Sequence, residues 1–136
     1  MVSFRHLCDT LQRMAFFKQT HQIPNNVNLE LAPKGNDPRY RDDSYMTIYI
    51  PLVAIVDGGV RFPLHELLCR CLEFYRICPM QCKPNFFRVV MGMATLKQLL
   101  GANLGVLDIQ HLYSIVPTVD DAYYLKWFQK AGDRHA

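Results

Sequence analysis

The segment LHELLCRCLEFYRIC at residues 64–78 constrains the fold most, because its apolar and polar side chains follow the repeat of an α-helix. At about 100° per residue, one side of this helix carries leucines, cysteines and aromatic residues: Leu64, Leu67, Leu68, Cys71, Leu72, Phe74, Tyr75 and Cys78. The other side carries His65, Glu66, Cys69, Arg70, Glu73 and Arg76. A helix of this kind buries one face against a core, and Pro63 is well placed in its first turn.

Residues 69–82 raise the question of a metal or redox site, because they hold four of the five cysteines. Cys69 and Cys71 fall on nearly opposite sides of the helix, so they cannot share one metal ion. The spacing C-x-C-x6-C-x3-C matches neither the usual zinc knuckle nor the C-x-x-C of thiol oxidoreductases. We therefore expect no metal and no cofactor. Cys71 and Cys78 are expected in the core, and Cys69 is expected to be an exposed thiol.

Other elements are predicted from periodicity and from helix-breaking residues. Helices are expected at about 3–19 (begun by Ser3), 85–100 (begun by Asn85 and ended by Gly101) and 106–116. Strands are expected at 27–31, 44–50 and 121–129, an exposed loop at 33–43 and a turn at 57–59. The pattern predicts a mostly helical α+β fold, in which a central helical hairpin packs on a small antiparallel sheet.

Length and composition are those of one globular domain, so we expect a single domain over residues 1–136, of which 50% are hydrophobic and 20% charged. The longest apolar run, residues 48–56, is too short to span a bilayer and contains Pro51. No secretory signal is recognised at the N-terminus. We therefore expect an intracellular protein of the cytoplasm or nucleus, with reduced cysteines and no membrane partner.

Charge gives a weak indication of nucleic-acid binding. The net charge is only +3, but residues 61–100 hold six basic side chains against Glu66 and Glu73, which is a local +4. The candidate phosphate contacts on this basic face are Arg70, Arg76, Arg88 and Lys97. The alternative is an ordinary solvated surface, since Glu66 and Glu73 are spaced to pair with arginines along the helix.

No catalytic motif is found, and we expect neither catalytic residues nor a small-molecule substrate. In IVDGGV, Gly58 stands where the loop of an aspartic protease needs serine or threonine. TVDDAYYL is similar to the paired metal-binding aspartates of a polymerase, but that motif has an aromatic residue at the position of Thr118. The five histidines are scattered, and there is no phosphate-binding or nucleophile motif. The chain is therefore not expected to be an enzyme.

A continuous segment, GGVRFPLHELLCRCLEFYRICPMQCKPNFFRVVMGMATLKQLLG, resembles the gag-like gypsy-type transposon proteins of plants. The motif residues are Arg61, Phe62, Pro63, Leu64, His65, Pro84 and Asn85. The resemblance covers about residues 20–130 and is strongest over 59–92. Glu66 and Cys82 depart from the family pattern, which has proline and leucine there. The matching positions have a structural interpretation: Pro63 and Asn85 begin helices, and Arg61 ties a turn to a helix end.

The resemblance implies a non-enzymatic domain of a plant retroelement, acting by protein–protein contact or by self-association. The alternative is a nucleic-acid-binding module that uses the basic face of residues 61–100. Paired arginines would favour the first interpretation, and clustered unpaired arginines would favour the second. An exposed apolar patch that includes Phe87, Met91, Trp127 or Phe128 would favour self-association.

Overall fold

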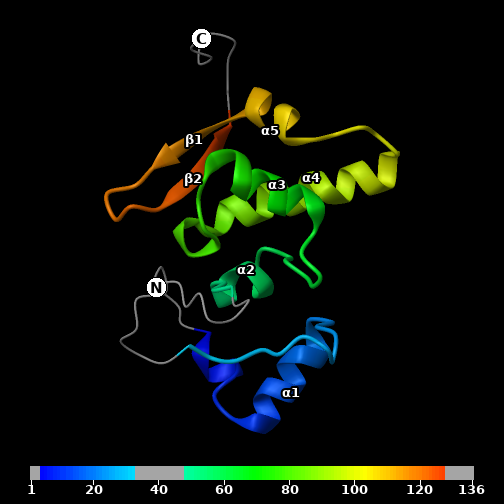
Figure 1. Cartoon of the computed structure of the whole chain (residues 1–136), viewed down its shortest axis with the longest axis vertical. Coiled ribbons are helices and arrows are strands. Elements are labelled where there is room, and N and C mark those ends of the chain that lie inside the picture. Colours follow the sequence, from blue (N-terminus) through cyan, green and yellow to red (C-terminus); the bar gives the residue numbers. More distant parts are fainter. Residues whose placement is uncertain (1–3, 33–47, 128–136) are drawn as a thin grey trace.

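The computed structural model describes residues 4–32 and 48–127 (Figure 1). The helical elements in this part of the chain are the 3-10 turn η1 (Arg5–Leu7), α1 (Leu11–Thr20), α2 (Leu52–Val56), α3 (Glu66–Tyr75), the 3-10 turn η2 (Pro79–Gln81), α4 (Pro84–Leu100) and α5 (Val106–Leu112). Strands β1 (Tyr113–Pro117) and β2 (Tyr123–Trp127) form an antiparallel pair. The predicted α+β class, mostly helical with a small antiparallel sheet, is confirmed.

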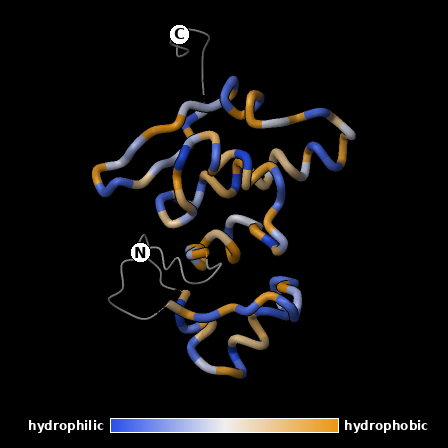
Figure 2. The backbone as a smooth tube through the Cα atoms, viewed as in Figure 1, coloured by the Kyte–Doolittle hydropathy of each residue, from blue (hydrophilic) through white to orange (hydrophobic). Residues whose placement is uncertain are grey.

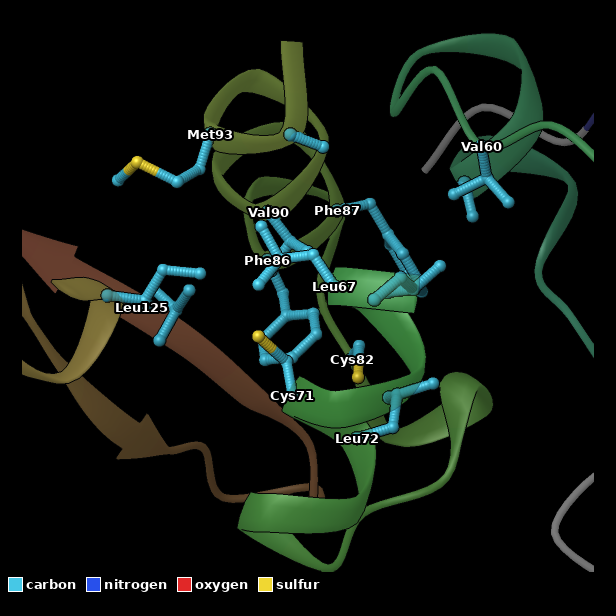
Figure 3. Close-up of a cluster of buried hydrophobic side chains, with 14 of the residues drawn as sticks. Val60, Leu67, Cys71, Leu72, Cys82, Phe86, Phe87, Val90, Met93 and Leu125 are labelled. Atoms are coloured by element: carbon cyan, nitrogen blue, oxygen red, sulfur yellow. The ribbon is translucent and has the colours of Figure 1, made fainter. Parts of the chain in front are cut away.

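The main core lies between the α3–α4 hairpin and β2. α3 packs on α4, and α4 packs on β2, so the hairpin and the sheet enclose one cluster of apolar side chains. Phe86 and Val90 of α4 are fully buried there and meet Cys71 of α3 and Leu125 of β2 (Figure 3). The helices bury one side because hydrophobic residues recur between hydrophilic ones along the chain (Figure 2).

A second, smaller cluster joins the N-terminal segment to α2. Its buried members are Cys8, Phe17, Ile23 and Ile55, with Ile55 supplied by α2. α2 lies between α1 and the helical hairpin in Figure 1. The segment 23–31 includes a turn, in which the Val27 N–H donates to the Pro24 carbonyl at 3.0 Å, and half-buried Val27 and Leu29 pack on the cluster. The predicted alternation of burial is therefore present, but residues 27–31 do not form a strand.

Two further predictions for the N-terminal half are wrong. The first helix begins only at Leu11, because Thr10 caps it by accepting a hydrogen bond from the Arg13 N–H at 3.1 Å. Ser3, the predicted cap, lies outside the described residues, as does the predicted loop at 33–43. The expected strand at 44–50 is not seen in its described part, residues 48–50. Instead, Pro51 is the N-cap residue of α2. The turn predicted at 57–59 is present at residues 57–58.

Two helix starts also differ from expectation. α3 begins at Glu66, after Pro63, because His65 caps it: His65 Nδ1 accepts a hydrogen bond from the Leu67 N–H at 3.0 Å. α4 begins at Pro84, so Asn85 lies in its first turn and is not its cap. Proline suits the first helical position because the N–H it lacks has no partner within the helix there.

The C-terminal ends of the helices were predicted better. Gly101 ends α4 in the left-handed conformation, with φ +61°, as expected. α5 ends at Leu112, earlier than predicted, because residues 113–116 pair with β2. The last strand, predicted over 121–129, is confirmed over 123–127; residues 121–122 precede it, and residues 128–129 lie outside the described part of the chain.

Candidate protein-contact surfaces

The motif residues hold the two clusters together at the turn before α3. The guanidinium of Arg61 donates to the carbonyl oxygens of Ile55 and Val60, both at 2.9 Å. Phe62 packs on the smaller cluster, whereas Leu64 packs on the main core. Arg61 therefore ties the turn to the end of α2, in agreement with its structural interpretation, and the motif joins the two halves of the protein.

Asn85 connects α4 to the sheet. Its side-chain amide donates to the Leu125 carbonyl at 2.7 Å, and its Oδ1 accepts from the Leu125 N–H at 3.3 Å. Close by, the backbone N–H of Lys83 donates to the Tyr123 carbonyl at 2.8 Å. The start of α4 thus satisfies the backbone groups on the outer edge of β2, which would otherwise be open.

The basic residues predicted as phosphate contacts are dispersed and partly paired. Arg70 forms an ion pair with Glu66 along α3, and Arg88 lies 3.6 Å from Asp57. Arg88 and Lys97 are nine residues apart in α4, about two and a half turns, so they project from opposite sides of that helix. Arg76 sits past the end of α3 in the left-handed conformation, with φ 55°. This arrangement does not bring the four side chains onto one helix face.

The exposed apolar patch differs from the one anticipated. Phe87 is buried, Met91 is half-buried, and Phe128 lies outside the described residues. Trp127 is half exposed and stacks edge-to-face on Tyr113, with ring centroids 5.1 Å apart.

Exposed leucines instead line the last two turns of α4. We call Leu96, Leu99 and Leu100 the leucine surface; their exposed fractions are 47%, 75% and 70%. Their i, i+3, i+4 spacing places them on one side of the helix. These leucines were not among the residues predicted for an exposed apolar patch. The sequence LKQLLG could have indicated the leucine surface, because its leucines continue up to Gly101, where the helix ends.

The cysteines form no evident chemical site. Cys71 is buried, and burial raises the pKa of its thiol to about 11. Burial also raises the pKa of Cys82. Cys78 is half-buried, with its thiol 3.3 Å from Gln81 Oε1, so its predicted core position is only partly correct. The described residues contain no group of three or more metal-ligating side chains that could hold a metal ion.

Thiol reactivity should follow this burial. At mildly alkaline pH, a disulfide reagent is expected to label exposed Cys69 first, because thiolates react and buried thiols are both covered and protonated. Cys71 and Cys82 should react at least about a hundredfold more slowly than Cys69, at a rate limited by opening of the fold. Stopped-flow absorbance checks this order, and Cys69→Ser should remove the fast phase alone. A fast phase that survives in Cys69→Ser would contradict the assignment.

Comparison with known proteins identifies the family. A family model described as "Putative gypsy type transposon" matches residues 50–117, which is half of the chain. The chain therefore belongs to this transposon-related family. The matched region begins just before α2 and ends with β1, so it includes all seven motif residues. No curated protein and no solved structure matches the chain. In the part of the chain that the structure describes, none of the helices is sufficiently long and apolar to cross a membrane.

Proposed function

We propose that this chain is a non-enzymatic, gag-like domain of a plant retroelement-derived protein that acts in the cytoplasm or nucleus by contacting other protein chains. Family membership supports the retroelement origin. The observation that carries the contact role is the leucine surface at the end of α4. The proposal that the domain has no catalytic activity rests only on the lack of a recognisable catalytic motif in the sequence.

The physical argument concerns the cost of leaving leucines in water. Leu99 and Leu100 keep 75% and 70% of their area exposed in the isolated chain. Full burial of a leucine contributes about 1.5–3 kcal/mol, so covering the leucine surface would contribute several kcal/mol to an association. Lys97 is the only charged residue between Arg88 and Asp108. An apolar surface with so little charge suits a protein partner better than a polyanion.

The alternative is nucleic-acid binding through Arg70, Arg76, Arg88 and Lys97. Arg70 and Arg88 already have carboxylate partners, Glu66 and Asp57, which reduce the positive potential they present. These ion pairs are exposed and weak, so phosphates could displace them in principle. We therefore treat nucleic-acid binding as the outcome that would overturn the proposal.

Fluorescence anisotropy with labelled single-stranded RNA and duplex DNA tests this choice, at low and at near-physiological salt. We expect no saturable binding under either condition. Light scattering across a concentration series should instead show self-association of the chain, which Leu99→Gln/Leu100→Gln weakens about tenfold or more. Leu11→Gln is the matched control, because Leu11 is 91% exposed on α1, outside the leucine surface.

Nucleic-acid binding would give a different result in the same experiments. Binding that falls steeply with salt and is lost in Arg70→Gln/Arg88→Gln would mean that the basic side chains meet phosphates. The nucleic-acid module would then replace the contact domain as the proposed function.

A further inference from the structure

The N-terminal part of the chain is closed on itself by polar contacts of its own. We call residues 4–32 the cover. The guanidinium of Arg5 donates to the Ala32 carbonyl at 3.0 Å, so the two ends of the cover meet. The Lys18 ammonium donates to the Val27 carbonyl at 2.9 Å and ties α1 to the segment that follows it. These bonds lie within the cover and do not depend on the rest of the protein.

The contact between the cover and the rest of the protein, by contrast, is mainly apolar. Three buried residues of the cover meet one buried residue of α2 in the smaller cluster: Cys8, Phe17, Ile23 and Ile55. Apart from Arg5, none of the described residues of the cover forms a hydrogen bond or an ion pair with residues 48–127. Separation of the cover therefore breaks mostly apolar contacts and leaves few polar groups to be satisfied again.

The main core does not depend on the cover. Ala54 of α2 belongs to the main core, whereas Ile55 belongs to the smaller cluster, and α2 lies between α1 and the helical hairpin (Figure 1). Arg61 holds the end of α2 to the turn before α3 through the Ile55 and Val60 carbonyls. In the described part of the chain, fifteen buried residues form the main core and four form the smaller cluster. The smaller cluster is therefore expected to open at a lower free energy.

We propose that the cover is a reversible autoinhibitory contact, which separates from α2 as one unit while the main core stays folded. Separation exposes an apolar surface, which we call the covered surface, made of Leu52, Ile55, Val56 and Phe62. In the closed state this surface, which includes the motif residue Phe62, is withheld from other chains. Its occupant is the cover itself, whose side chains are packed on it. The covered surface is distinct from the leucine surface, so the inference goes beyond the proposed function and does not rest on it.

His21 makes the closed state sensitive to pH. It follows the last residue of α1 and stacks on buried Phe17, with ring centroids 4.5 Å apart. Burial, and then the positive charge of Arg61 across the contact, lower the pKa of His21. α2 carries no charge, and Lys18 of α1 is directed at the Val27 carbonyl. The closed state is therefore fully favoured above the ordinary histidine pKa and is weakened as the pH falls below it toward the lowered pKa of His21.

Two neighbouring phenylalanines of α1 provide a matched pair of variants of the full chain. Phe17 is 3% exposed in the smaller cluster, whereas Phe16 is 71% exposed. In Phe17→Ala we expect the protection of α1 amides from hydrogen exchange, followed by NMR, to fall about tenfold or more. Amides in the middle of α4 should keep the protection that they have in the unmodified protein. Phe16→Ala should leave both sets of amides unchanged.

A labelled synthetic peptide of residues 4–32 is the probe for the covered surface. Fluorescence anisotropy should show that it binds the Phe17→Ala chain. It should bind the unmodified chain at least about tenfold more weakly, because the chain's own cover competes at a high effective concentration. The same peptide with Phe17→Ala should not bind either chain.

The role of His21 is tested by repeating the exchange measurement at about pH 7.5 and about pH 5.5. Protection of α1 amides, relative to those of α4, should fall at the lower pH in the unmodified protein. In His21→Gln it should not change with pH. A pH dependence that survives in His21→Gln would overturn the role of His21.

Loss of protection in α4 together with α1 in Phe17→Ala would mean that the cover and the main core unfold as one unit, and the proposal would fail. It would also fail if α1 lost protection but the peptide bound neither chain. Neither outcome concerns the leucine surface, whose own test is the self-association weakened in Leu99→Gln/Leu100→Gln.

Discussion

Replacing Gly58 by alanine is expected to lower the free energy of unfolding by about 3 kcal/mol, because the added methyl group has no space. A Cβ built at Gly58 lies 2.6 Å from the Ala54 carbonyl oxygen and 2.7 Å from Phe87 Cβ. Ala54 and Phe87 are both buried, one in α2 and the other in α4. The methyl group would therefore push α2 away from the helical hairpin. The shift in the midpoint of urea unfolding, at unchanged slope, measures the loss.

Two other glycines supply matched controls for this effect. Gly59 has φ +77°, and a Cβ there lies no closer than 3.9 Å to another heavy atom, so Gly59→Ala should cost only about 1–2 kcal/mol of backbone strain. Gly92 lies inside α4 with nothing within 4 Å, so Gly92→Ala should raise the free energy of unfolding by about 0.5–1 kcal/mol. A Gly58→Ala protein as stable as the unmodified protein would refute the close packing of α2 on α4.

The sequence was sufficient for elements whose pattern is local. The repeat in residues 64–78 predicted the exposure of Cys69 and most of the buried face of α3, although Phe74, which was placed on that face, is 48% exposed. Gly101 predicted the end of α4. The alternating burial along 27–31 was predicted correctly, but the predicted strand is wrong, because alternation shows which side is covered and does not supply a partner strand. For residues 48–50, β-branched and aromatic residues indicated a strand that is not seen, and no element was predicted for residues 52–56, which form α2 and bury Ala54 and Ile55.

The candidate surfaces were harder to predict, because exposure depends on where neighbouring elements end. Phe87 and Leu99 are both large apolar residues of the same helix. Phe87 is buried because α2 and α3 cover that part of α4, and Leu99 is exposed at the far end of the same helix. The closure of the outer edge of β2 depends on long-range contacts in the same way, since Asn85 reaches a strand forty residues later.

Asn85 is the motif residue whose role can be tested most directly. Its side chain replaces a neighbouring strand for Leu125, which is itself 2% exposed. Asn85→Ala leaves the Leu125 N–H and carbonyl without partners in a buried position. Each such group costs about 1–3 kcal/mol, so we expect the free energy of unfolding to fall by about 3 kcal/mol. Asn103→Ala, at an exposed position between α4 and α5, should change it by less than about 0.5 kcal/mol.

The amides that lose protection from hydrogen exchange in Asn85→Ala show whether Asn85 acts at the edge of the sheet or only at the start of α4. If Asn85 closes the edge of β2, the Leu125 amide should exchange with solvent faster in Asn85→Ala, while amides in the middle of α4 keep their relative protection. If Asn85 mainly stabilised the first turn of α4, protection would fall first at the start of that helix, and Leu125 would follow only with global unfolding. Asn85→Asp refines the test, since the carboxylate can still accept from the Leu125 N–H but repels its carbonyl at neutral pH. We expect Asn85→Asp to be nearly as destabilising as Asn85→Ala, because the 2.7 Å bond to the carbonyl is the shorter of the two.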